Sequence, residues 1–441
     1  MIKDIVLACM LIACVLWALK EPWIGILGWT LVSLMSPHEQ WGSATATWPM
    51  GMALAIATLL GFVVTKEKSN PFTSAGPWLV LLFSAWITIT LPASIFFDLS
   101  YPLWLRTIKI FFMLFITLAL INTRKKLDLF IWVNVLALAF YGIKGGIFTI
   151  VTGGNHRVWG PGGFIDGNNE VALAVITVIP LMRYLQTQMK STRAIMAMTV
   201  AMALCVIMAL GSYSRGALLG VAAMGAFFWL KGDKKLLWGV LIVGMSAVAL
   251  SLMPEQWWAR MNTIDSYQGD SSAQGRINAW WMAFNLAKDR FLGGGFMIWT
   301  GAVFQMYAPV PDDPHAAHSI YFQVLGEHGF MGLFIFLSIG VATWISARWL
   351  IKAGRTDPQF RFAASLGPMV QVSMIGYAVT GAFLSLAYFD LPYNVMVMAA
   401  VAQRIVRQEQ AAAAGERSAT AVAHSGETHQ HHQQDPPGSP P

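Results

Sequence analysis

The chain has 441 residues, of which 56% are hydrophobic and only 12% are charged. Soluble globular domains carry about 25% charged residues, so this composition excludes an ordinary soluble domain. The net charge of +7 does not indicate nucleic-acid binding, because the basic residues gather in connections between apolar segments. The three cysteines lie in apolar segments without CxxC spacing, so we expect neither disulfides nor a cysteine-bound metal.

Runs of about 17–25 apolar residues, each long enough to cross a bilayer, recur along the whole chain. The predicted spans, about 12–13 in number, lie near residues 4–19, 22–36, 49–64, 77–92, 101–121, 128–151, 169–185, 194–212, 216–230, 236–253, 329–349, 364–388 and 391–406. The first of them has no small-residue cleavage site, so we expect it to be retained. The sequence therefore predicts an all-α polytopic membrane protein.

The basic connections predict how these spans are oriented. They are Lys66/Lys68, Arg124/Lys125/Lys126, Lys190/Arg193, Lys231/Lys234/Lys235 and Arg348 to Arg361. An even number of spans separates each from the next, so all five lie on one side, which the positive-inside rule makes cytoplasmic. The loops 152–168, 212–216 and 254–328 then face the periplasm. The orientation of the first two spans stays open.

The same reading divides the chain into five parts. They are an N-terminal transmembrane half (1–185), central transmembrane helices (186–253), a periplasmic loop (254–328), C-terminal transmembrane helices (329–407) and a tail (408–441). The tail is rich in Ala, Gln and Pro, so we expect it to be disordered and cytoplasmic. The loop carries tryptophans expected at the membrane interface, which are Trp257, Trp258, Trp280 and Trp281.

Residues 312–330, DDPHAAHSIYFQVLGEHGF, hold three of the nine histidines of the chain. His318 is expected at a helix start near the outer interface, where a neutral imidazole could take a proton from an attacking hydroxyl. Asp312, Asp313 and His315 stand near enough to orient it. Two other readings remain: a structural interfacial histidine, and a metal site built from the two carboxylates and the His-x-x-His pair.

Several arginines lie on the predicted periplasmic side, where the positive-inside rule does not lead us to expect them. Arg215 lies in GSYSRGALLG, Arg276 in SSAQGRINAWW, and Arg157 just before a Gly/Pro-rich loop closed by Asn168 and Asn169. Glycines allow close approach of a ligand, and guanidinium groups bind phosphate bidentately. Converging arginines would suit a lipid-linked pyrophosphate. The competing reading is that each arginine caps a helix or extends to lipid headgroups.

Four short motifs occur in a particular order. They are Ser214-Arg215-Gly216, Gly275-Arg276 in the long outer loop, His318-Ser319-x-Tyr321 and Gly329-x-x-Gly332. This order resembles the O-antigen ligase and polymerase superfamily, which includes the ligase WaaL, the polymerase Wzy and the oligosaccharyltransferase PglL. The N-terminal half, with WALKEPWIGILGWTLVSLMSPHEQ and RVWGPGGFIDGNNEVA, is similar to O-glycosylation ligases associated with exosortase A systems. The likeness covers roughly residues 1–405.

The resemblance implies a GT-C-like glycosyltransferase architecture in the bacterial inner membrane. The implied reaction transfers a glycan from undecaprenyl pyrophosphate to an acceptor hydroxyl on a lipid, glycan or protein in the periplasm, with inversion and without metal, nucleotide or other cofactor. It places the acting histidine on His318 and the principal arginines on Arg215 and Arg276. Ser319 stands where many relatives have Asn, so His315 stays open as the principal histidine.

We expect further substrate contacts from Arg157, Asn168, Asn169, His315, Asp312 and Tyr321. Three other functions remain open: a polysaccharide polymerase of the same superfamily, a lipid or glycan transporter, and a non-catalytic scaffold. Transporters place ionisable groups near the membrane midplane. Lys109 and Lys144 are the main such groups here, and the polar residues gather at the outer surface instead, which favours an enzyme. No nucleic-acid partner is expected.

Overall fold

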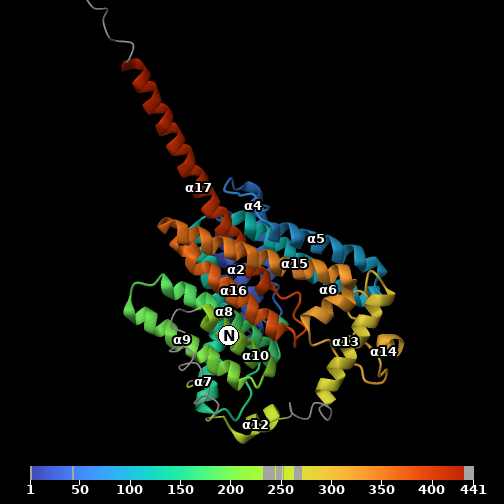
Figure 1. Ribbon diagram of the computed structural model, residues 1–441. Coiled ribbons are helices and arrows are strands. Elements are labelled where there is room, and N and C mark those ends of the chain that lie inside the picture. Colours follow the sequence, from blue (N-terminus) through green and yellow to red (C-terminus); the bar gives the residue numbers. More distant parts are fainter. Residues whose placement is uncertain are drawn as a thin grey trace, which may run out of the picture.

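The structure, a computed structural model, describes residues 2–41, 44–231, 244, 251, 253–262 and 271–431 (Figure 1). The described part is helical and contains no strand. Eight of its helices are long and apolar enough to cross a bilayer: α1 (Ile2–Lys20), α5 (Ala75–Thr90), α6 (Phe97–Leu120), α7 (Arg124–Val151), α8 (Asn168–Thr187), α9 (Thr192–Gly211), α15 (Ile320–Thr356) and α16 (Arg361–Gly381). Three shorter apolar helices are α2 (Pro22–Met35), α4 (Met50–Val64) and α10 (Arg215–Lys231). The predicted all-α multi-pass architecture is confirmed.

Most predicted spans coincide with one of these helices. The last predicted span, 391–406, coincides with the first part of α17 (Asp390–His431). The predicted span 236–253 falls almost wholly outside the described residues. The predicted span 364–388 is too long, because α16 ends at Gly381 and residues 382–389 form a loop. That loop has the hydropathy of a span because its own apolar side chains, such as Leu384 and Phe389, are buried in the protein core.

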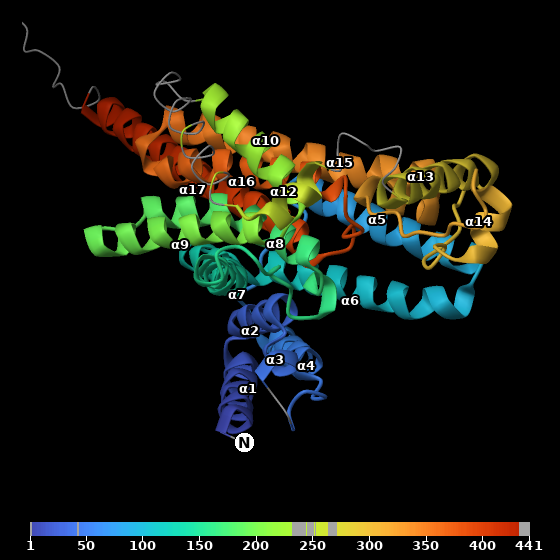
Figure 2. The same cartoon turned by 90° about the horizontal axis from the view of Figure 1, so that it is seen from below.

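The helices α1, α2 and α4, with the short α3 (Pro37–Trp41), project from the rest of the molecule (Figure 2). The Asp4 carboxylate accepts hydrogen bonds from the backbone N–H groups of Ala44 and Thr45, at 2.9 and 3.1 Å. The first residues of α1 therefore lie beside the connection between α3 and α4. A Cβ on Gly162 would lie 2.8 Å from the Glu39 carboxylate of α3, so that connection shares a side with the loop 152–168.

The C-terminal helix α17 is buried at its start and projects away from the bundle at its end (Figure 1). Arg404 anchors it, donating to the backbone oxygens of Leu118 (2.7 Å), Ile121 (2.6 Å) and Asn70 (2.9 Å). Beyond this anchor the helix continues to His431, where the sequence led us to expect disorder from residue 408. The alanine-rich segment after Arg407 has high helix propensity, and no proline interrupts it before residue 436.

The region predicted as one long loop, 254–328, is largely helical. It contains α12 (Glu255–Asn262), α13 (Ser271–Asp289) and α14 (Gly301–Tyr307), and its last residues begin α15. In Figure 1, α13 and α14 lie together at one end of the bundle, next to the start of α15. The helix α15 is interrupted at Gly329, where φ is 70°, a value that glycine adopts without steric cost.

The first residues of α10 and of α15 both pack against the end of α16. A Cβ on Gly216 would lie 3.2 Å from the Phe383 Cβ, and a Cβ on Gly381 would lie 2.7 Å from the Ile320 Cδ1. A side chain at either glycine would make its neighbour shift, so both glycines favour this close packing. The end of α16 therefore brings Arg215 and His318 to the same end of the bundle.

Candidate functional site

His318 lies two residues before the first residue of α15, Ile320, near the helix start that the sequence predicts. Its φ of 41° is in the left-handed region, which costs a non-glycine residue on the order of 1 kcal/mol or more. Its neighbours hold the backbone in place, because Ala317, Ser319 and Ile320 are all buried. The imidazole itself is only partly buried, so it lies at the edge of the protein core.

The helix α13 holds the loop that carries the histidines. The Asn278 amide donates to the backbone oxygens of Val310 (2.8 Å) and Asp313 (3.1 Å) and accepts the N–H of Val310 (2.9 Å). The Trp280 indole donates to the Ala317 oxygen at 2.7 Å. Trp280 was predicted to lie at the membrane interface, and its ring is partly exposed while its N–H is bonded within the protein. Asn278 was not anticipated.

His315 packs directly on α13. A Cβ on Gly275 would lie 2.6 Å from its ring, so only glycine allows this contact. Its Nδ1 is 3.1 Å from an Asp313 carboxylate oxygen. Asp312 instead accepts a hydrogen bond of 2.8 Å from Gln305 on α14. The predicted residues 312–318 are therefore divided: His315 packs on α13, whereas Asp312 is hydrogen-bonded to α14.

The electrostatic environment keeps His318 neutral. Burial lowers the pKa of His318 below its ordinary value of 6.5, and the charges of Arg276 and His315 lower it further. The close packing of the His315 ring on Gly275 places the next residue of α13, Arg276, beside the loop that carries His318, as required if both act on one substrate. An imidazole with a lowered pKa is unprotonated at neutral pH and can accept a proton.

Arg276 also interacts electrostatically with Glu170, in the first turn of α8. This acid was not predicted as a site residue. The segment GNNEV offered a signal, because an acid follows directly on two polar residues at the start of an apolar helix. Glu170 connects the histidine region to the N-terminal end of α8, where Asn168 and Asn169 lie.

The turn between α9 and α10 forms the second half of the site. Tyr213 has a φ of 59° and is buried, and its hydroxyl donates to the Gly154 oxygen at 2.7 Å. The Asn168 amide donates to the Ser212 oxygen at 2.7 Å. The Ser214 hydroxyl accepts the Ala217 N–H at 3.2 Å and so caps α10, which presents Arg215 at its first position.

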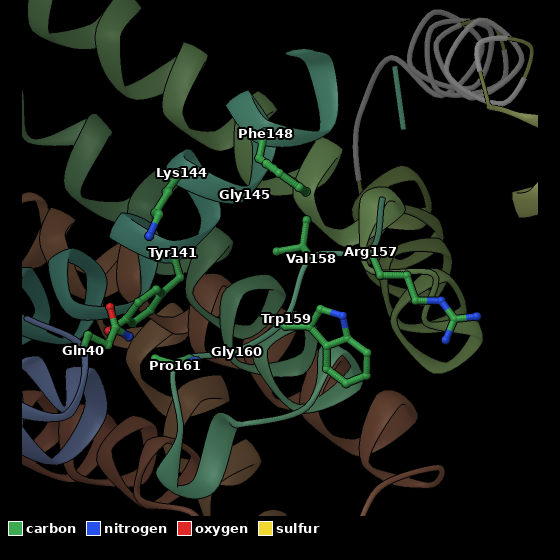
Figure 3. A pocket seen from close by; sticks show the side chains of 10 residues that line it. All are labelled: Gln40, Tyr141, Lys144, Gly145, Phe148, Arg157, Val158, Trp159, Gly160 and Pro161. Carbon is green, nitrogen blue, oxygen red and sulfur yellow. The ribbon is translucent and has the colours of Figure 1, made fainter. Parts of the chain in front are cut away.

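Arg157 lies at this turn, with its guanidinium carbon 5.4 Å from the centre of the Tyr213 ring. It also lines a cavity of about 400 Å³ (Figure 3), whose other residues are Gln40, Tyr141, Lys144, Gly145, Phe148, Val158, Trp159, Gly160 and Pro161. Figure 3 shows the Lys144 ammonium near Tyr141 and the Arg157 guanidinium on the opposite side. Gln40 donates to the Tyr141 hydroxyl at 2.6 Å, and the Trp159 indole is 64% exposed.

The structure thus gathers most of the predicted residues at one end of the bundle. Tyr321 was predicted to contact the substrate. In the structure its hydroxyl donates to the Ala378 oxygen at 2.8 Å, a hydrogen bond that joins α15 to α16. Among the residues that the structure describes, no three His, Cys, Asp or Glu side chains lie close enough together to hold a metal ion. The DDPHAAH segment therefore supplies no such ligand set by itself.

Two stretches of the chain match models of known families. Residues 200–337 match the family model described as O-antigen ligase, and this stretch includes Arg215, Arg276 and His318. Residues 2–190 match a family of unknown function (DUF5935). The search of curated proteins gave no match. The likeness to exosortase-associated ligases stays a prediction. Residues 200–337 are therefore similar to the O-antigen ligase family, which supports a glycan-handling membrane protein of the O-antigen ligase and polymerase type.

Proposed function

We propose that the chain is a glycan ligase of the bacterial inner membrane. It transfers a glycan from undecaprenyl pyrophosphate to an acceptor hydroxyl on the periplasmic face, with inversion and without a metal ion. The observation that carries this proposal is the packing of His315, three residues before His318, on Gly275 next to Arg276, within the stretch that matches the O-antigen ligase model. A cation beside a neutral imidazole provides the two groups that such a transfer needs.

In the proposed reaction, His318 accepts the proton of the acceptor hydroxyl while the hydroxyl oxygen attacks the anomeric carbon. The bond between that carbon and the pyrophosphate oxygen breaks, and the pyrophosphate leaves with the electron pair. Attack from the opposite face inverts the anomeric centre. Arg215 and Arg276 stabilise the negative charge that develops on the leaving group, which is usually the largest contribution in this kind of catalysis.

The cavity beside Arg157 supports a role for this arginine in substrate binding. It combines an exposed indole, Trp159, with polar groups from Gln40, Tyr141 and Lys144. An apolar surface with a few convergent polar groups is typical of small-molecule sites. We assign this cavity to the sugar part of a substrate, next to the turn that carries Arg215. Asn169 lies at the same end of α8 and is included in this assignment.

Two alternatives remain in view. A polymerase of the same superfamily would use the same residues and differ in its acceptor. A lipid transporter is favoured by one observation: α15 is broken at Gly329, beside the buried Glu327 and His328. Interrupted helices with ionisable groups are found at transporter binding sites. The Glu327 carboxylate, however, accepts hydrogen bonds from Tyr388 (2.5 Å) and Trp299 (3.2 Å), which gives it a structural role.

The test is glycan transfer in proteoliposomes that contain an undecaprenyl-pyrophosphate-linked donor and a panel of acceptors. Wild type is compared with His318→Ala and Arg215→Ala, each with and without chelator, and with Tyr321→Phe as a matched control near the site. We expect transfer by wild type and the control, loss in the two site variants, and no effect of chelator. Transfer by both site variants would contradict the assignment. Movement of the donor across the bilayer, without transfer, would favour the transporter.

A further inference from the structure

The other end of α15 contains a second pocket, far along the helix from His318. It has a volume of about 560 Å³ and is lined by Trp344, Arg348, Ile351, Lys352, Arg355 and Thr356 of α15 and by Gln371 of α16. The three cations follow one another at spacings of four and three residues, so they share one face of the helix. All three are exposed, and none of the described residues that line the pocket is acidic. This pocket is therefore strongly electropositive.

Gln371 gives independent support for a ligand. Its side chain is 1% exposed, and its amide nitrogen is buried without a hydrogen-bond partner among the residues that the structure describes. Buried polar groups are nearly always hydrogen-bonded, and an unpaired buried donor is costly. Because Gln371 also lines the pocket, an oxygen atom of a bound molecule can satisfy this amide.

The pocket changes from charged to apolar along α15. Arg355 and Trp344 are eleven residues apart, which corresponds to about 16 Å along a helix. Arg348, Lys352 and Arg355 lie toward the helix end, in a connection predicted to be cytoplasmic, whereas Trp344 lies deeper and packs on Phe227 with ring centres 5.7 Å apart. A molecule that fits must carry negative charge at one end and apolar groups at the other.

We propose that this pocket binds one anionic phospholipid from the membrane leaflet at this end of the bundle. The phosphate lies among Arg348, Lys352 and Arg355, because charge-assisted hydrogen bonds to phosphate are the strongest that these side chains make. The Gln371 amide donates to an ester or phosphate oxygen, and an acyl chain lies along Ile351 and Trp344. Basic pockets between transmembrane helices on the cytoplasmic side bind anionic headgroups in this way. The inference does not depend on the proposed glycan transfer.

The experiment is native mass spectrometry of the full chain, released from detergent after incubation with phosphatidylglycerol, phosphatidylcholine or glycerol 3-phosphate. The double variant Arg348→Gln/Lys352→Gln removes two cations of the pocket. The matched control Lys125→Gln/Arg193→Gln removes two exposed cations of other basic connections. We expect wild type and the control to retain one phosphatidylglycerol each, and the pocket variant to bind it roughly tenfold or more weakly. Phosphatidylcholine and glycerol 3-phosphate should bind much more weakly.

Gln371→Leu provides a second readout. Since it replaces a buried unpaired amide with an apolar group, we expect it to raise the thermal midpoint of the lipid-free protein. It should also reduce the rise in midpoint that phosphatidylglycerol causes, because the ligand loses a hydrogen bond. Equal lipid retention by the pocket and control variants would overturn the proposal. So would full competition by glycerol 3-phosphate, which would identify a soluble phosphate as the ligand, or wild type retaining no phosphatidylglycerol.

Discussion

The segments just before α10 and α15 share a backbone pattern, a residue with positive φ followed by a serine. They differ in which residue carries the side chain proposed to act in catalysis. Before α10, Tyr213 has a positive φ and is followed by Ser214; before α15, His318 has a positive φ and is followed by Ser319. Both helix starts pack against the end of α16. At α10 the strained residue is a buried aromatic, and the candidate group, Arg215, follows it. At α15 the strained residue is itself the candidate base.

A residue in the left-handed conformation can either pack its side chain into the core, as Tyr213 does, or present it at the surface of the site, as His318 does. Tyr213 contributes its ring to a small cluster with Trp257 and Met261, so its conformation is maintained by packing around the side chain. His318 is maintained by the buried residues on both sides of it, while its own ring is partly exposed. Strain of this kind persists only where the surroundings fix it, and it is frequent at active sites. Replacing each residue with glycine separates backbone from side chain.

The largest effect is expected for His318→Gly. Glycine adopts the observed φ without strain, so the thermal midpoint should stay the same or rise. Loss of a general base typically costs about 10²–10⁴ in rate, so glycan transfer in proteoliposomes should fall by that factor. Free imidazole should restore part of the activity. Unchanged transfer by the variant would show that His318 is not the base and would leave His315 as the candidate histidine.

The next largest effect is expected for Arg215→Gln and Arg276→Gln. Removal of one group that stabilises charge in the transition state usually costs about 10²–10³ in kcat. Each variant should therefore lose transfer by this factor at neutral pH, with insertion and thermal midpoint checked by fluorescence-detected chromatography. Arg157→Gln, which alters the cavity of Figure 3, should instead raise KM more than it lowers kcat. Equal losses of kcat in all three variants would contradict the assignment of Arg215 and Arg276 to transition-state stabilisation and of Arg157 to substrate binding.

Tyr213→Gly should lower the stability of the protein more than its activity, in contrast to His318→Gly. Truncation of a large buried aromatic costs about 3–5 kcal/mol, and the relief of backbone strain offsets about 1 kcal/mol of that. The variant should unfold at a clearly lower temperature, yet each molecule that remains folded should transfer glycan within several-fold of wild type. A thermal midpoint equal to that of wild type would show that the ring does not hold this turn.

The smallest effect is expected for Tyr321→Phe. The hydroxyl donates to the Ala378 oxygen, and a single neutral hydrogen bond contributes about 1 kcal/mol. The thermal midpoint should fall slightly and transfer should not change. A loss of transfer comparable to that of the arginine variants would instead make Tyr321 a substrate contact, as the sequence motif suggested.

Hydropathy was enough to predict most of the apolar helices and the start of α15 just after His318, because a long apolar stretch follows that residue. Hydropathy could not predict the hydrogen bonds by which Asn278 and Trp280 hold the loop before α15, since they join residues more than thirty positions apart. The electrostatic interaction between Arg276 and Glu170 is equally non-local, because the two residues lie far apart in the sequence. The sequence also mistook the buried loop 382–389 for the end of a span, since burial in protein and burial in lipid require the same apolar composition.

The most direct test of the account is the pH dependence of kcat/KM for glycan transfer by wild type, Arg276→Gln and Arg215→Gln. The pKa of His318 is lowered, so wild-type activity should be constant near neutrality and fall only as the pH drops below the ordinary histidine value. The Arg276 charge contributes to that lowering. Its removal should therefore raise the pKa and move the acid limb to higher pH, whereas Arg215→Gln should leave the limb in place. An acid limb that is the same in wild type and Arg276→Gln would contradict the claim that this arginine and His318 act together.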